Sequence, residues 1–349
     1  MSYFEGMLLV VLNRFGSDRS LSAAFHLLKG KKSSQTIQDA KLFRIGFLFG
    51  MLKGLERDQF DRVVLRLEKS GLLKRNYQGS VILTSKGNTE LRGFLESNPF
   101  PDSLNGWKYH HLTEQFWQRL SLFMQSLSCS VYETMSFYPV SKEESTQVWV
   151  KKHFPISKDA RKRTAEQLYH EIFSILEPLP EHHAKLFIQR LSGSERTGLT
   201  LKQAAAIYSI TVEEATIQFN GTLHAFLSTI QNNKENYPLL SSFAANEYAE
   251  IPLTSSTRQT LELIQRGLDI DQIANSRRLK RSTIEDHLVE IAMNVEGFSI
   301  DLFVSKKAQQ DILSASSETN SQRLKTIKEH LKESYSYFQI RLTLCKEGI

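Results

Sequence analysis

Apolar residues recur at every third or fourth position along most of the chain, which is the spacing that one buried face of an α-helix requires. This pattern predicts helices at residues 3–15, 20–29, 35–52, 109–132 and 157–176. Two short strands are predicted at residues 72–76 and 80–84, on either side of a turn. The chain is therefore expected to be mainly α-helical, and its 349 residues are enough for two or three domains.

The sharpest pattern lies at residues 255–292, which reads as three consecutive helices. Ser256 or Thr257 can cap the first helix, and Gly267 stands where that helix must end. Asp269 can cap the short second helix, and a basic turn follows it. Two short helices joined by a tight turn are the helix-turn-helix, which sets its second helix in the major groove of DNA.

The last helix of this segment would be the one that reads DNA. Ser282 can cap it, and Glu285 stands three residues later, at the spacing of a capping box. Its predicted buried stripe consists of Ile284, Leu288 and Ile291. Its predicted outward positions are Thr283, Asp286, His287 and Glu290.

Basic residues are concentrated in the turn before that helix. The candidate DNA contacts there are Arg277, Arg278, Lys280, Arg281, Ser282, Thr283 and His287. Cationic side chains favour DNA because they release counterions from its phosphates. Residues 255–292 nevertheless carry six Lys and Arg against six Asp and Glu, so their net charge is zero. A structural or partner-binding role therefore stands as the alternative to DNA contact.

The N-terminal segment, residues 1–97, has the element order of a winged helix. A helix over residues 58–70 that Gly71 ends precedes the two strands, and a closing helix is predicted at 85–95. Tyr77 at the tip could stack on a terminal base pair. The candidate phosphate contacts are Arg62, Arg66, Lys69, Lys74, Arg75 and Lys86. Residues 20–100 carry fourteen Lys and Arg against seven Asp and Glu, a net charge of +7, although a solvated basic face would explain this too.

The middle of the chain is expected to be helical over residues 98–192, with a second helix-turn-helix candidate at 193–235. In that candidate Thr200 can cap the first helix, and the outward face includes Glu213 and Glu214 but no cation. An acidic face repels phosphate, so protein docking or a scaffold role is favoured there. Residues 236–254 are expected to be a linker to the C-terminal domain at 255–349.

Composition and motifs narrow the possible functions. The 44 Lys and Arg against 38 Asp and Glu give a net charge of +6, a mild bias toward polyanions. Cys129 and Cys345 are too few for a disulfide framework, which favours a reducing cytoplasm. The nearest phosphate-loop candidate, residues 30–33, lacks the earlier glycine because Phe25 occupies its position, so no ATP motor is predicted. No catalytic residue, metal, cofactor or membrane segment is expected.

The runs IANSRRLKRSTIEDHL and RLKTIKEHLKESYSYFQIRLTLC resemble the helicase-associated helix-turn-helix domain at the C-terminal end of some RecQ-type helicases. By length and layout the chain is also similar to bacillar YpbB-type proteins, which are encoded beside a RecQ-like helicase. Arg278 stands where the family usually has Gly in the turn. A left-handed backbone at this position would therefore be modestly strained.

This resemblance implies a non-catalytic, cytoplasmic and nucleoid-associated protein that binds duplex or forked DNA. It also implies a partner, the RecQ-like helicase encoded nearby, and a role in DNA repair or recombination. The predicted fold class is a mainly α, multi-domain protein with an N-terminal winged-helix-like domain and a C-terminal helix-turn-helix domain. A helix-turn-helix transcription regulator and a protein-docking scaffold without DNA contact are the alternatives.

Overall fold

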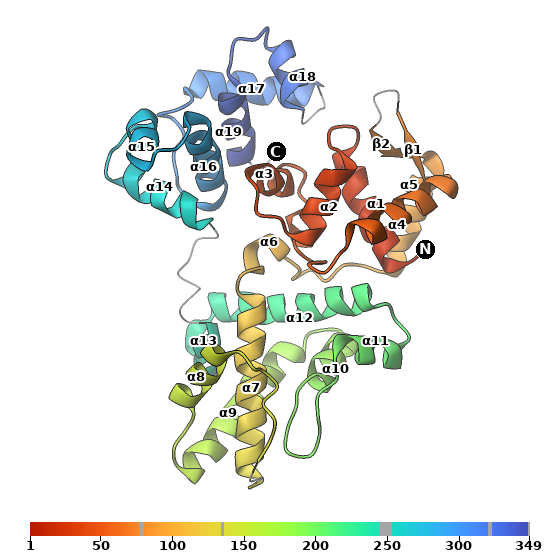
Figure 1. Cartoon of the computed structure of the whole chain (residues 1–349), viewed down its shortest axis with the longest axis vertical. Helices are drawn as coiled ribbons and strands as arrows, with labels where there is room; N and C mark the ends of the chain where they lie inside the picture. The colour runs from red at the N-terminus through yellow and green to blue at the C-terminus, as the bar shows by residue number, and fades with distance from the viewer. Residues whose placement is uncertain (77–79, 134–135, 245–252, 320–322, 348–349) are drawn as a thin grey trace. The chain divides into compact units, whose positions relative to one another are not determined.

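The computed structural model describes residues 1–76, 80–133, 136–244, 253–319 and 323–347. The fold is mainly α-helical, as predicted (Figure 1). The chain forms two compact units, each built from segments that are distant in the sequence. The first unit combines Met1–Gly6 with Phe94–Ala249, and the second combines Met7–Gly93 with Glu250–Ile349.

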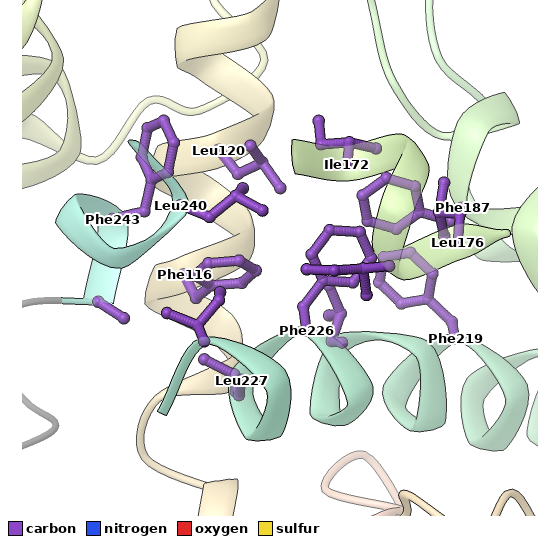
Figure 2. Packing of buried hydrophobic residues seen from close by; sticks show 14 of the residues in the cluster. Phe116, Leu120, Ile172, Leu176, Phe187, Phe219, Phe226, Leu227, Leu240 and Phe243 are labelled. Atoms are coloured by element: carbon purple, nitrogen blue, oxygen red, sulfur yellow. The ribbon is translucent and has the colours of Figure 1, made fainter. Parts of the chain in front are cut away.

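The first unit is built around two crossing helices, α7 and α12, whose apolar faces meet in one core (Figure 1). Its elements are α6 (Gly106–Tyr109), α7 (Thr113–Val131), α8 (Glu144–His153), α9 (Lys158–Leu176), α10 (Glu181–Gln189), α11 (Leu201–Tyr208), α12 (Val212–Asn232), the 3-10 turn η2 (Lys234–Asn236) and α13 (Pro238–Ala244). Figure 2 shows the aromatic centre of this core, where the rings of Phe187 and Phe226 stack with centroids 4.8 Å apart. The helix predicted at 109–132 is interrupted after Tyr109 and resumes at Thr113.

The linker expected at residues 236–254 contains a helix, α13, and in this part the expectation is wrong. Leu240 and Phe243 of α13 are buried in the core of the first unit. Glu171 of α9 accepts hydrogen bonds from the backbone N–H groups of Leu239 (3.2 Å) and Leu240 (2.9 Å). The cap that stabilises α13 therefore comes from a carboxylate 68 residues earlier in the chain, outside any local sequence pattern.

The N-terminal part of the second unit contains the predicted helix–hairpin–helix order. Its elements, with those that extend past its ends, are α1 (Tyr3–Phe15), α2 (Leu21–Lys29), α3 (Ser34–Leu42), the 3-10 turn η1 (Gly46–Leu48), α4 (Arg57–Lys69), β1 (Leu73–Arg75), β2 (Val81–Leu83) and α5 (Ser85–Ser97). The two strands are antiparallel, with Leu73 opposite Leu83 and Arg75 opposite Val81. The predicted strands are thus confirmed at their centres.

The single helix predicted at residues 35–52 is wrong. Helix α3 ends at Leu42, Arg44 has φ = 52°, and η1 follows. Gly50 has φ = 68° and lies so close to Gly30 that a Cβ on Gly30 would be 2.7 Å from the Gly50 Cα atom. The apolar positions are buried as expected, but the backbone must leave the helix to allow this close approach.

The C-terminal part of the second unit is organised around α16, which packs against α14, α15, α19 and, from the N-terminal part, α3. Its helices are α14 (Ser255–Gln265), α15 (Ile270–Arg277), α16 (Arg281–Asn294), α17 (Lys306–Thr319), α18 (Leu324–His330) and α19 (Tyr337–Glu347). Ile284, Leu288 and Ile291 are fully buried, as predicted. Because helices surround α16, only its first turns remain available to a ligand.

Candidate nucleic-acid interface

The turn between α15 and α16 has the geometry of a helix-turn-helix. Asp269 and Gln272 form a reciprocal capping box at the start of α15, as the sequence predicts for Asp269. Arg278 ends α15 in the left-handed conformation, with φ = 52° and ψ = 41°, which confirms the strained position that the missing glycine predicts. Leu279 packs against a small apolar cluster that includes Ile273 and Ile284. The turn is therefore held in place from both sides.

Two of the predicted caps in this segment are wrong. Helix α14 is capped by Thr254, whose hydroxyl accepts a hydrogen bond from the Thr257 N–H, and not by Ser256 or Thr257. Helix α16 begins at Arg281, so that Ser282 lies inside its first turn and no side chain caps it. Glu285 pairs with Arg281 at 3.3 Å instead of closing a capping box.

The start of α16 offers an exposed basic surface. Arg278, Lys280 and Ser282 are exposed, and Thr283 is half-buried. In the part of the chain that the structure describes, Arg278 and Lys280 have no ion-pair partner. The first backbone N–H groups of α16 also lack a side-chain cap. Free N–H groups at a helix N-terminus beside two cations are suited to bind a phosphate.

Arg277 serves a different purpose, because its guanidinium points into a polar seam between α14 and α16. Its Nη1 donates to the Ser256 carbonyl (2.7 Å) and to the Thr260 hydroxyl. Its Nη2 donates to the Ser256 hydroxyl and to Gln259 Oε1, each at 2.9 Å. Burial lowers the pKa of Arg277 from its ordinary value. The guanidinium therefore fixes α15 to α14. Its N–H donors are used inside the protein and do not face DNA.

The outward orientation predicted for His287 and Glu290 is wrong, since α14 covers that side of α16. His287 is 6% exposed, and its Nδ1 lies 2.8 Å from the Thr260 hydroxyl. Burial, with Arg277 nearby, lowers the pKa of His287 to about 4. Glu290 is 4% exposed and accepts hydrogen bonds from Thr254 and from the Thr257 hydroxyl (2.6 Å). Both side chains stabilise the module and are not available to bases.

Arg281 is exposed but already paired. Its Nη1 contacts Asp271 of α15 at 2.5 Å, and its Nε contacts Glu285. These carboxylates raise the pKa of Arg281. Asp286 in turn pairs with Arg341 of α19 at 2.7 Å. Two carboxylates therefore already neutralise the charge that Arg281 would offer to a phosphate.

The hairpin module, which consists of α4, β1, β2 and α5, carries predicted cations of two kinds: some are exposed and others are paired. Arg62, Arg66, Lys69 and Lys74 are exposed on α4 and β1. Arg75 pairs with Glu68 at 2.9 Å, and Lys86 donates from Nζ to the Ser70 carbonyl at 3.0 Å. Tyr77 lies outside the described residues. As sites of DNA contact, these residues stay predictions.

The second helix-turn-helix candidate forms as the sequence predicts. Thr200 closes a capping box with Gln203, and Ser209 takes the left-handed conformation with φ = 55°. Ile207 and Val212 are exposed on either side of this turn, at 60% and 44%. Apolar side chains beside a face without cations suit a protein partner better than a phosphate.

The described residues contain neither a metal-ligand cluster nor a membrane-spanning helix. Within those residues, no group of three or more His, Cys, Asp or Glu side chains could hold a metal ion. No helix in the described segments is long and apolar enough to cross a bilayer.

Comparison with known proteins assigns the chain to a family. The profile of a helix-turn-helix domain matches residues 256–344. The chain is also 33% identical to "Protein YpbB" of Bacillus subtilis (strain 168), over 348 residues that cover 99% of this chain and 98% of that protein. The chain belongs to the YpbB family. No solved structure matches it.

The matched domain profile extends the helix-turn-helix to a whole C-terminal domain, because residues 256–344 reach from α14 to α19. A helix-turn-helix domain indicates DNA binding. Sequence reasoning missed the contacts of Thr260 with His287 and of Thr257 with Glu290, because each joins two helices that are separate in the sequence. It also missed Arg323, Lys325 and Arg341, whose cations come together only in the folded unit.

Proposed function

We propose that this YpbB-family protein is a non-catalytic DNA-binding accessory of a RecQ-like helicase and acts in DNA repair or recombination in the cytoplasm. The observation that carries the DNA contact is the exposed pair Arg278 and Lys280 in front of the uncapped start of α16. Two cations and free helix N–H groups hold a phosphate through charge and hydrogen bonds together.

Only the first turns of α16 are exposed. This favours an accessory role over recognition of a specific operator sequence. Base readout needs several side chains of one helix to reach into the major groove. Here the second half of α16 is buried, and its two accessible acidic residues, Glu285 and Asp286, are paired with arginines. The module would therefore contact the DNA backbone and show little preference for base sequence.

The N-terminal hairpin module would supply a second phosphate-binding surface. Arg62, Lys69 and Lys74 are exposed, with no ion pair inside the described segments. In this proposal the helicase hydrolyses ATP, while the accessory chain provides duplex or fork affinity in trans. The sequence resemblance to RecQ C-terminal domains supports the choice of partner. The apolar, cation-free turn around Ile207 and Val212 is a candidate surface for the helicase contact.

A pull-down with the neighbouring helicase, combined with fluorescence anisotropy on duplex, forked and single-stranded DNA, tests the proposal. The salt slope is the slope of log affinity against log salt concentration. The double variant Arg278→Ala with Lys280→Ala should lower it by about 1.8 for duplex DNA, because two phosphate contacts are lost. The matched control is Lys306→Ala with Lys307→Ala, which removes two exposed cations of α17 from the same domain. An unchanged slope in the folded double variant contradicts the proposed contact.

Three other results separate the alternatives. Tight binding to one palindromic site would favour a transcription regulator. No binding to any DNA at low salt would leave a protein-docking scaffold. DNA binding without capture of the helicase would retain the DNA contact and remove the accessory role.

A further inference from the structure

A cavity of about 570 Å³ in the second unit lies between α3, α16, α18 and α19. Its lining includes four cations, Arg19, Arg323, Lys325 and Arg341. Two carboxylates, Asp39 and Asp286, also line it, so the cavity has a net charge of +2. These residues come from distant parts of the chain, and only the packing of α3 against α16 and α19 brings them together.

Among the described residues, three polar groups around this cavity have no hydrogen-bond partner. Gln38 is 7% exposed, and its Nε2 has no hydrogen-bond acceptor. Asp39 is 1% exposed, and its Oδ2 is likewise unpaired, as is Nε of Arg341. An unpaired buried polar group costs about 1–3 kcal/mol, so a polar ligand that partners these groups would gain from doing so. Two of the three groups are N–H donors, which a ligand rich in acceptors would satisfy.

Arg19 and Arg341 keep donors in reserve, whereas Arg323 is paired with Asp18 (3.5 Å) and donates to the Ser17 carbonyl (3.0 Å). Arg19 uses Nε for Asp39 (2.6 Å) and Nη1 for the Asp18 carbonyl (2.9 Å). Arg341 uses Nη1 for Asp286. A guanidinium has five N–H donors, so each arginine can hold its carboxylate and still bind a phosphate oxygen. The Lys325 side chain is 77% exposed, and its ion pair with Glu329 is long, at 3.8 Å. Its ammonium can therefore turn toward a phosphate.

A second hollow of about 410 Å³ shares Arg19 and Arg323 with the first. Arg75 of β1 and Ser80 also line it, so the two hollows connect the hairpin to the C-terminal domain. Hollows joined by shared arginines suit an extended polyanion better than a single small ion. In the first hollow the half-exposed ring of Tyr337 offers an aromatic surface, with Lys328 Nζ 4.7 Å from the ring centroid.

We infer that these two hollows bind a single strand of nucleic acid, with its phosphates on Arg19, Arg323 and Lys325 and one base stacked on Tyr337. Stacking on an aromatic ring beside a cationic track is the general means of binding single strands without reading their sequence. The inference rests on the proposed DNA-binding function and assigns the strand and the duplex to different surfaces. The duplex contacts Arg278 and Lys280, whereas the strand follows the hollows toward the hairpin.

Anisotropy with a fluorescent oligothymidine strand tests this assignment on the full chain. Tyr337→Ala should weaken strand binding by about 5- to 100-fold, while Tyr337→Phe retains it, because a phenyl ring still stacks. Lys325→Glu should weaken binding and lower the salt slope by about 0.7 or more. The matched control, Lys307→Glu, makes the same charge change at an exposed position that does not line either hollow.

Duplex binding, measured in parallel, separates this inference from the proposed function. Duplex affinity that depends on Arg278, with strand affinity indifferent to Tyr337 and Lys325, overturns the inference alone. Loss of all DNA binding in the native chain overturns both. Thymidine monophosphate and inorganic phosphate serve as competitors, and a mononucleotide that binds when the oligonucleotide does not would overturn the strand as the occupant.

Discussion

Two adjacent arginines, Arg277 and Arg278, should respond in opposite ways to mutation. Arg277→Ala removes four donated hydrogen bonds to three residues of α14. Each bond contributes about 1 kcal/mol net, and a half-exposed bond contributes less. We therefore expect the free energy of unfolding of the second unit to fall by about 2 to 3 kcal/mol. DNA affinity per folded molecule should change little, because this guanidinium faces inward.

Arg278→Gly should instead stabilise the second unit and weaken DNA binding. A left-handed backbone costs a non-glycine residue about 1 to 2 kcal/mol, and glycine adds about 0.5 to 1 kcal/mol of unfolded-state entropy. The net effect is a gain of roughly 0.5 to 1 kcal/mol in stability. The loss of one phosphate contact should lower the duplex salt slope by about 0.9.

Hydrogen exchange over residues 255–294 is the suitable stability measurement. All three tryptophans, Trp107, Trp117 and Trp149, lie in the first unit, so their fluorescence would not report on this module. Far-UV circular dichroism during urea unfolding provides the second probe. Stability unchanged in Arg277→Ala, together with a lower salt slope in that variant, would refute the distinction between the two arginines.

Two further predictions concern the first unit. Burial lowers the pKa of His224 to about 3, against about 6.5 in the unfolded chain, so the unfolded state binds the extra proton below pH 6.5. Stability should therefore be complete above pH 6.5 and fall by up to about 1.4 kcal/mol per pH unit below it, and tryptophan-monitored urea midpoints that stay flat from pH 7 to 5 would contradict this. Glu171→Ala removes the carboxylate that caps α13 and should destabilise the unit by about 2 to 3 kcal/mol, whereas the exposed Glu166→Ala on the same helix should not. Trp149 lies 5.2 Å from Phe243 of α13, so its emission should shift only in the first variant.

Local patterns predicted those parts of the fold that depend on neighbours in the sequence. The cap at Asp269 and the buried stripe of α16 follow from residues within one or two turns of each other, whereas the left-handed Arg278 follows from the resemblance to a family with glycine at that position. The stripe is set by helical periodicity, and the helix starts by the side chains that can cap them. The helix-turn-helix could therefore be located from sequence alone.

Features set by distant segments could not be predicted in this way. His287 and Glu290 are polar and lie off the apolar stripe, so periodicity placed them outside. They are buried because α14 carries matching hydroxyl groups, Thr257 and Thr260, which satisfy them across the helix interface. The same holds for α13, whose cap is Glu171. A one-dimensional pattern shows which faces are polar but not which polar faces find partners.

These buried polar contacts explain how one short module can be both rigid and accessible. Arg277, His287 and Glu290 fasten α14 to the helix-turn-helix from the inside. The turn that bears Arg278 and Lys280 is consequently held in a fixed orientation without any contribution from its own exposed side chains. A phosphate that binds these cations finds them on an ordered backbone, so little conformational entropy is lost on binding. In the proposed DNA contact, Arg277 and His287, which the sequence assigned to DNA, would therefore act indirectly, by holding Arg278 and Lys280 in place.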